Sequence, residues 1–330
     1  MIQTESLTRI YYTRKRLSLF RSEWEEKVAV RELSLQIPEG RITGLLGVNG
    51  AGKTTTIKML STMLLPSAGR GTVAGMDLVK DAHRIRPLVN VIAGGERALY
   101  WRLTGRENLW YFGQLYQIEQ RELKGRIDSL LAQVGLTEAA DTPVERYSKG
   151  MKQRLQIARG LINQPRYLFM DEPTLGLDAP IARQLRKMTR DLAEQQGCAV
   201  LLTSHYMFEV EELCDYIYVV NRGRLIGEGA PRQIAAMVTG EKGARVVVAG
   251  EATAAELEGA VRMGLPGVQT VTAAVGEQGL TVTVKAKADL TAPLVELLSR
   301  RGMRILRAES LEPSLEDAIV ALAEQQGVVA

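Results

Sequence analysis

The feature that most restricts the possible folds of this chain is the run GVNGAGKT at residues 47–54. It fits the pattern G-x-x-x-x-G-K-[ST]. The apolar run RITGLLG (41–47) comes before it and a helix-forming run, KTTTIKML, follows, which predicts a buried strand, a turn and a helix. In such a turn the glycines let successive N–H groups point at phosphate oxygens, and the new helix adds its positive end. The sequence therefore predicts an α/β fold with a phosphate site where a strand meets a helix.

The residues of this loop have distinct expected roles. Lys53 is expected to reach the β- and γ-phosphates of a nucleotide, and the Thr54 hydroxyl to ligate Mg²⁺. Kinases, GTPases and many ATPases share such a loop, but the chain has no Asn-Lys-x-Asp motif for reading guanine, which counts against a GTPase. The residues expected to contact ATP here are Asn49, Gly50, Ala51, Gly52, Lys53, Thr54 and Thr55.

A second informative stretch runs from residue 147 to residue 178, YSKGMKQRLQIARGLINQPRYLFMDEPTLGLD. Ser148 is a good N-cap for the helix that follows it, and Gly150 leaves its N–H open to a ligand. Apolar residues then recur at helical spacing, which predicts that one face of the helix packs inward. These residues are Met151, Leu155, Ala158 and Ile162.

The apolar run YLFM (167–170) predicts a buried strand that ends in two carboxylates. Open α/β sheets place ligands at the carboxyl ends of their strands. Asp171 is expected to hold Mg²⁺ through water, and Glu172 to polarise the water that attacks the γ-phosphate. The alternative, a pair of solvated turn carboxylates, is disfavoured by the phosphate loop upstream.

With these motifs in place, the chain over residues 4–235 resembles an ATP-binding cassette (ABC) ATPase, the nucleotide-binding subunit of an ABC transporter. The family's signature Leu-Ser-Gly-Gly-Gln is replaced by Tyr-Ser-Lys-Gly-Met (147–151), which resembles the Lys-Gly-Met variants of its drug-resistance and sodium-export group. The resemblance implies a P-loop NTPase core (1–92 and 163–238, a mostly parallel sheet) within an ABC ATPase domain 1–238, interrupted by a helical subdomain at 96–162.

The resemblance also implies roles for residues outside the two motifs. Gly176-Leu177-Asp178 resembles the loop that contacts a second cassette, and His205 stands where the family's switch histidine touches the γ-phosphate. Tyr11 is expected to stack on adenine, with Tyr12 as the alternate and a strand-edge packing role as the rival interpretation. A charged stretch, residues 13–28, follows this tyrosine and is longer than the family's usual linker.

One position departs from the family pattern. The family's glutamine, which senses Mg²⁺ and water at the edge of the helical subdomain, is replaced by Gly95, beside Glu96. Two hypotheses stay open: Glu96 takes over the polar role, or backbone and water make the contact with slower turnover. The ATPase rate of Glu96→Ala separates them.

Residues 239–243 (TGEKG) are predicted to be a linker to a second domain, 244–330. The pattern beyond it predicts strand, helix, strand, strand, helix, strand and a final helix, which is typical of a small ferredoxin-like α+β domain. No catalytic constellation is visible in it. A regulatory role, support of a dimer and an inert structural role are all open.

Composition limits the partners. A net charge of +4 is too small to imply nucleic acid, and the only cysteines, Cys198 and Cys214, are neither a disulfide framework nor a zinc site. The longest apolar runs, such as YLFM and IYVV, are far shorter than the ~20 residues of a membrane span. Any transport function is therefore expected to use a separate permease.

The resemblance implies an ATPase with ATP and Mg²⁺, at the cytoplasmic face of the membrane, bound to a permease and to a second cassette. Each ATP would lie between one chain's phosphate loop and the other's signature turn, so that Ser148 and Gly150 act in trans. Two rival functions stay open: a soluble cassette ATPase acting on ribosomes or nucleic acid, and a regulatory nucleotide-binding module with weak turnover.

Overall fold

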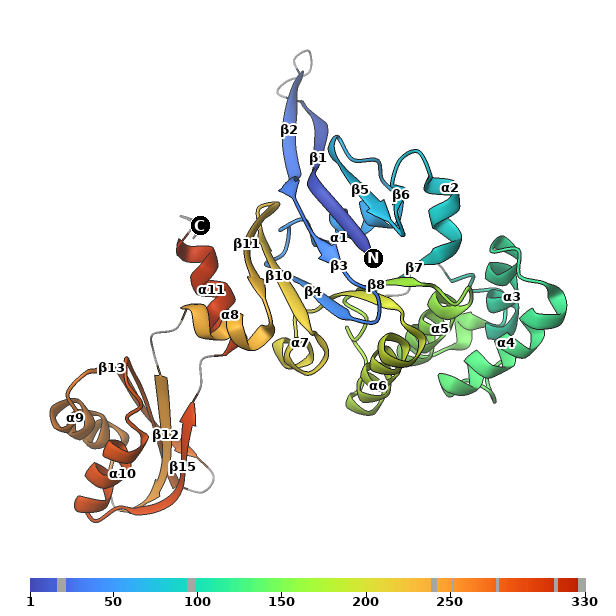
Figure 1. Ribbon diagram of the computed structural model, residues 1–330. Coiled ribbons are helices and arrows are strands. Elements are labelled where there is room, and N and C mark those ends of the chain that lie inside the picture. Colours follow the sequence, from blue (N-terminus) through green and yellow to red (C-terminus); the bar gives the residue numbers. More distant parts are fainter. Residues whose placement is uncertain are drawn as a thin grey trace. The chain divides into compact units, whose positions relative to one another are not determined.

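The computed structural model describes residues 1–16, 22–93, 99–238, 242–250, 252–276, 279–311 and 314–325. The chain divides into two compact units, residues 1–231 and 232–330, and Figure 1 labels most of their elements. Residues 239–241 of the predicted linker lie outside the described residues, so the predicted domain boundaries stay predictions. Among the described residues, no helix has the length and apolarity needed to cross a bilayer.

A six-stranded sheet forms the centre of the first unit. Its order is β11 (Arg224–Gly229), β10 (Tyr216–Asn221), β4 (Ile42–Leu46), β9 (Ala199–Thr203), β8 (Tyr167–Asp171) and β7 (Val89–Ala93). All neighbours are parallel except β10 and β11. Every residue of β4 and β9 is buried, as expected of a parallel sheet covered on both faces. The predicted mostly parallel sheet is confirmed.

A second, antiparallel sheet was not predicted. It consists of β1 (Ile2–Arg16), β2 (Ser22–Leu33), β3 (Gln36–Ile37), β5 (Ala68–Val73) and β6 (Met76–Asp77). Most of the charged stretch 13–28 belongs to β1 and β2, which pair Thr13 with Glu25 and Lys15 with Glu23. These two strands form the long hairpin that projects from the first unit in Figure 1.

The main core of the first unit lies between its two sheets. It joins apolar residues of β1, β2 and β5 to α1 (Lys53–Leu60) and to one face of the parallel sheet, where Tyr167 and Phe169 are fully buried. The opposite face of the parallel sheet packs against α6 (Ala179–Gln196), where the Thr189 hydroxyl lies 3.7 Å from the sulfur of Met170. The phosphate loop therefore starts from a strand that is held on both faces.

The helical subdomain contains α3 (Gly105–Leu115), α4 (Gln120–Gln133) and α5 (Lys149–Leu161), after the short helices α2 (Ala82–Ile85) and η1 (Arg86–Leu88). A capping box between Thr104 and Glu107 starts α3, since each side chain binds the other residue's backbone N–H. The predicted inward face is confirmed at Leu155 and Ala158 of α5 and at its C-cap Ile162, whereas Met151 is only partly buried. A 3₁₀ turn, η2 (Val144–Arg146), leads into α5.

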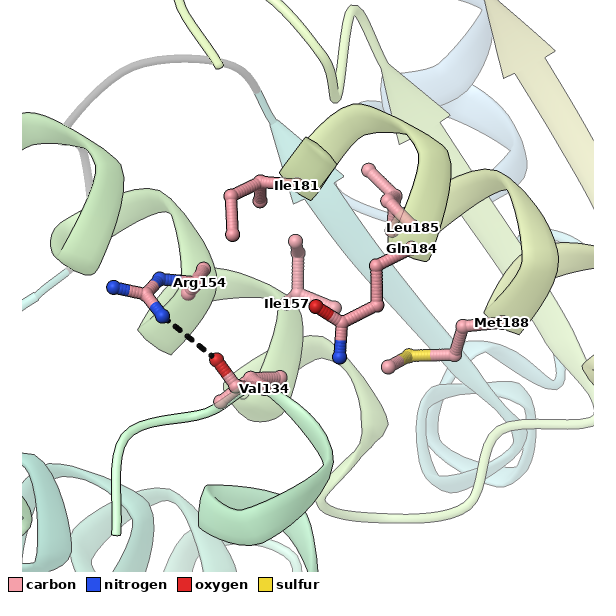
Figure 2. A pocket seen from close by; sticks show the side chains of 7 residues that line it. All are labelled: Val134, Arg154, Ile157, Ile181, Gln184, Leu185 and Met188. Carbon is pink, nitrogen blue, oxygen red and sulfur yellow. Dashed lines mark hydrogen bonds between the residues drawn. The ribbon is translucent and has the colours of Figure 1, made fainter. Parts of the chain in front are cut away.

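Side chains of α5 and α6 bind the carboxyl end of α4. Arg154 donates to the carbonyls of Val134 and Gly135 at 3.4 and 3.1 Å, and the Gln184 amide donates to Gln133 O at 2.7 Å. The pocket in Figure 2 lies between these helices and has room for about one water molecule. The carbonyls that a helix end leaves unpaired are thus satisfied from two other helices.

The second unit confirms the predicted ferredoxin-like domain. Strands β12 (Lys242–Ala249), β13 (Val268–Gly276), β14 (Gly279–Ala286) and β15 (Arg304–Leu311) form an antiparallel sheet in the order β13-β14-β12-β15. Helices α9 (Ala254–Gly264) and α10 (Thr291–Arg300) bury Leu257, Val261, Leu294 and Leu298 against it. The unit also contains α11 (Leu315–Gln325) and nearly all of α8 (Pro231–Val238).

Candidate nucleotide-binding site

Three loops meet at one edge of the parallel sheet. Strands β4, β9 and β8 are neighbours and run parallel, so the loops that follow them leave the sheet at the same edge. These loops carry the run 47–54, the pair Asp171-Glu172 and His205. The edge is the place where α/β sheets bind ligands.

The loop at 47–52 depends on glycine for its shape. Gly47, Gly50 and Gly52 have φ of 151°, 81° and 106°, values that other residues rarely adopt. A Cβ at Gly47 would come within 2.0 Å of the Val220 carbonyl oxygen. The Gly223 N–H donates to Ala51 O at 2.9 Å, which fixes the loop to the turn between β10 and β11.

Lys53 points its ammonium group back into this loop. The nitrogen donates to Gly47 O at 2.6 Å and to Val48 O at 3.3 Å, and the side chain is buried. Burial lowers the pKa of Lys53, while the carboxylates of Glu172 and Asp171 act in the opposite direction. A buried ammonium bound to carbonyls in this way is suited to phosphate oxygens that enter the loop.

Asp171 is held by hydroxyl groups on both sides. Its Oδ2 atom accepts from Thr54 at 2.7 Å and its Oδ1 atom accepts from Thr203 at 2.7 Å. Thr54 and Asp171 were predicted from the sequence, whereas Thr203 was not. The only signal for Thr203 was a hydroxyl residue at the end of an otherwise apolar strand.

Glu172 and His205 lie together. The Nε2 atom of His205 is 2.7 Å from Oε1 of Glu172, and both side chains are partly exposed. The Glu172 backbone has a φ of 54°, and its N–H donates to both the carbonyl and the hydroxyl of Thr203 at 3.1 Å. A carboxylate beside an imidazole at the rim of a phosphate loop can accept a proton from a water molecule.

The donor set fits a magnesium nucleotide. Mg²⁺ prefers oxygen ligands and usually takes one or two carboxylates together with substrate phosphates and water. Thr54 and Asp171 supply a hydroxyl and a carboxylate beside the Lys53 ammonium. Within the part of the chain that the structure describes, no group of three or more His, Cys, Asp or Glu residues forms a separate metal site.

Comparisons with known proteins agree with this geometry. The model of the family described as "ABC transporter" matches residues 30–175. Daunorubicin resistance ATP-binding protein DrrA2 of Streptomyces coeruleorubidus is 34% identical over 93% of this chain and 94% of its own. The chain belongs to the ABC transporter family. As a member, it is an ATP-hydrolysing nucleotide-binding subunit.

Two further ABC transporter proteins are similar to this chain, one over nearly the same share of it as DrrA2 and one over a smaller share. Nod factor export ATP-binding protein I of Rhizobium sp. (strain N33) is 38% identical and covers 90% of this chain and 92% of its own. ABC transporter ATP-binding protein NatA of Bacillus subtilis (strain 168) is 42% identical over 61% of this chain and 82% of its own.

Solved structures of ABC cassettes share the fold. One, described as the ATP-binding subunit of an ABC transporter, covers 72% of this chain and 92% of its own at 24% identity and a TM-score of 0.62. A cassette solved as a dimer in a post-hydrolysis state with ADP and Pi has 21% identity and a TM-score of 0.62, over 70% of this chain and 98% of its own.

The signature turn of this ABC subunit starts α5. Ser148 is the N-cap and accepts from the Met151 N–H at 3.2 Å, and a Cβ at Gly150 would meet only the Ser148 hydroxyl, at 4.0 Å. Gln153, on the same helix, donates to Pro173 O at 2.8 Å and ties the turn to the loop after Glu172. Gln153 was not predicted from the sequence.

Tyr11 lies on β1, opposite Lys27 of β2, and the Arg9 guanidinium lies 4.9 Å from its ring centre. The alternate, Tyr12, is strongly exposed. These surroundings do not decide which tyrosine stacks on adenine, so the Tyr11 assignment stays a prediction. Gly95 and Glu96 lie outside the described residues, and both hypotheses about them stay open.

Proposed function

We propose that this chain hydrolyses ATP to drive export through a separate membrane permease, with a second cassette as its partner. The observation that carries the proposal is the Glu172–His205 pair, 2.7 Å apart, at the edge where the phosphate loop begins. That pair argues for turnover rather than nucleotide binding alone.

In this proposal, the work of the site is mostly positioning and charge stabilisation. The Lys53 ammonium and the N–H groups of residues 49–55 would hold the phosphates. Thr54 and Asp171 would hold Mg²⁺, which would supply positive charge to offset that of the phosphates. Glu172 orients and polarises the attacking water, and His205 holds the γ-phosphate and the Glu172 carboxylate in line. Thr203 fixes the Asp171 carboxylate and the Glu172 backbone, because its hydroxyl donates to Asp171 and accepts from the Glu172 N–H.

The dimer is proposed because the signature turn is open to a partner. The Ser148 residue is exposed, and its hydroxyl accepts one hydrogen bond, from within α5. The N–H groups at the start of α5 add the partial positive charge of a helix end. Ser148 and Gly150 would therefore bind the γ-phosphate held by the other cassette. The dimeric state of a solved cassette of the same fold is in keeping with such a pairing.

The permease would dock on aromatic side chains of the helical subdomain. Tyr100, Tyr111 and Phe112 pack ring against ring, with centroids 4.8 to 6.1 Å apart. Beside them, Trp101 and Trp110 are 52% and 49% exposed. Exposed aromatics of this kind often anchor protein interfaces. Relatives named for drug resistance and Nod factor export support an export direction, and the subunit would sit at the cytoplasmic face of the membrane.

Co-purification from gently solubilised cells tests the proposal. We expect a multi-span membrane protein to elute with the tagged chain, and the double variant Trp101→Ala/Trp110→Ala to lose it. Trp24→Ala is the matched control, because Trp24 is 71% exposed but lies on the β1–β2 hairpin. Recovery of ribosomes or nucleic acid with no membrane protein would refute the permease proposal.

A further inference from the structure

A buried carboxylate lies behind the candidate site. Glu209 is at the start of α7 (Met207–Leu213) and is 5% exposed. Its Oε2 atom accepts from the Thr174 hydroxyl at 2.8 Å and from the Ser204 hydroxyl at 3.0 Å. Both hydroxyl residues are themselves buried. One carboxylate oxygen therefore joins two loops that are 30 residues apart in sequence.

The two loops are those that carry Glu172 and His205. Thr174 comes two residues after Glu172, and Ser204 comes directly before His205. The Ser204 hydroxyl also accepts from the Tyr206 N–H at 3.0 Å, so both neighbours of His205 belong to a fixed turn. Movement of Glu209 would therefore be passed to both members of the 2.7 Å pair.

The charge of Glu209 is balanced on its other side. Its Oε1 atom lies 3.2 Å from Nη1 of Arg186, on α6. Arg186 also pairs through Nε with the exposed Glu212, at 2.9 Å. A buried carboxylate needs such a partner, because removing one member of a buried pair leaves an uncompensated charge. One oxygen of Glu209 therefore binds the two loops, and the other binds the Arg186 guanidinium.

We propose that Glu209 is a positioning residue for ATP hydrolysis, which holds the Glu172 and His205 loops at the separation that the attacking water requires. The proposal rests on the catalytic roles proposed for Glu172 and His205. Reaction rates fall steeply when reacting groups are displaced by about 1 Å, by as much as ~100-fold. A residue that only stabilises the fold would change the amount of active protein and leave the rate of each active site unaltered.

Glu209→Gln separates these roles. The amide keeps the size of the side chain, but its NH₂ group must face either the guanidinium or the two hydroxyls, so one side loses its acceptor. We expect kcat for ATP hydrolysis, per nucleotide-binding site titrated, to fall about 10- to 100-fold, with KM within about threefold of wild type. Thr174→Val removes one of the two hydroxyls without changing the shape of the side chain, so it should lower kcat less than Glu209→Gln does. The double variant Thr174→Val/Glu209→Gln should have the same kcat as Glu209→Gln alone.

Glu212→Gln is the matched control. It removes a carboxylate from Arg186 but touches neither loop, so its kcat should equal that of wild type. A wild-type kcat per site in Glu209→Gln, or an equal loss in Glu212→Gln, would overturn the positioning role. Glu172→Gln is measured in parallel: near-normal turnover there would refute the proposed catalytic roles themselves, whereas an inactive Glu172→Gln with a fully active Glu209→Gln would refute the positioning role alone.

Discussion

The imidazole of His205 and the carboxylate of Glu172 approach to 2.7 Å, although they follow different strands of the parallel sheet. The contact depends on the strand order, which makes β8 and β9 direct neighbours. It also depends on Thr203, whose carbonyl and hydroxyl both bind the Glu172 N–H. The positions of the two backbones therefore bring Glu172 and His205 together, in addition to the length of their side chains.

Glu172→Gln should still bind ATP but hydrolyse it at least about 100-fold more slowly, because an amide is a far weaker proton acceptor than a carboxylate. The variant should accumulate as a dimer in ATP. Phosphate release and size-exclusion chromatography measure the two effects. Glu138→Gln, an exposed carboxylate after α4, is the control. Near-normal turnover in Glu172→Gln would exclude Glu172 as the catalytic base.

Lys53→Ala should weaken nucleotide binding by about 10- to 100-fold, as expected for the loss of charge-assisted hydrogen bonds of about 1.5–3 kcal/mol. The ammonium already lies in the loop, at 2.6 Å from Gly47 O. Titration with a fluorescent ATP analogue measures the change. Lys58→Ala, exposed on the same helix, should bind the analogue as wild type does. Equal affinities of the two variants would contradict the phosphate role of Lys53.

Asn108→Leu should destabilise the first unit by about 3 kcal/mol, because it leaves several buried backbone groups without partners. The Asn108 side chain is fully buried; it accepts from the Tyr100 N–H at 2.8 Å and donates to Tyr100 O and Thr104 O at 3.0 and 2.9 Å. Urea denaturation measures the loss. Gln114→Ala, exposed on the same helix, should stay within about 0.5 kcal/mol of wild type.

Alanine at two helical glycines should act in opposite directions. A Cβ at Gly160 would lie 2.2 Å from Cγ1 of Ile92, so Gly160→Ala should cost about 1–3 kcal/mol by overpacking. A Cβ at Gly125 meets nothing within 4 Å, so Gly125→Ala should stabilise α4 by about 0.5–1 kcal/mol. Thermal denaturation compares the two. Gly160 lies on α5 and Ile92 on β7. A stabilised Gly160→Ala would therefore contradict the close approach of these two elements at Gly160.

Cys198 and Cys214 should be unreactive in the folded protein. Burial raises the pKa of each thiol to about 12, so the reactive thiolate is scarce at pH 8. Their contribution to stability is full below the unfolded pKa of about 8.5 and is lost as pH rises from there towards 12. A disulfide reagent should label both thiols quickly in urea and slowly without it. Rapid labelling of the native protein would contradict the described burial.

The elements predicted correctly are those with a strong local pattern. The strands β4 and β8 follow from short, mostly apolar runs, and every predicted strand and helix of the second unit is present. The antiparallel sheet escaped prediction because the outer parts of β1 and β2 are exposed on both faces and carry charges at successive positions. Their pairing is set by each other and not by a core.

In the site, too, residues in a local motif were predicted and residues that depend on distant partners were not. The glycines, Lys53, Asp171 and Glu172 follow from spacing along the chain, whereas Thr203 and Glu209 gain their importance from partners distant in sequence. Two cations of α5 illustrate the physical reason. Lys152 and Arg159 lie off the apolar stripe, yet both are largely buried, over the rings of Trp101 and Phe112 at 4.7 and 5.2 Å. A helical pattern alone does not reveal a ring supplied by another segment.

The contact between the phosphate loop and the β10–β11 turn has a consequence for biosynthesis. Gly47 packs on the Val220 carbonyl and Ala51 accepts from the Gly223 N–H, although the loop is made more than 160 residues earlier. A nascent chain on the ribosome lacks this support until residue 223 has emerged. We therefore expect a chain cut before residue 220 to hold its phosphate loop less firmly and to bind ATP more weakly than the full cassette.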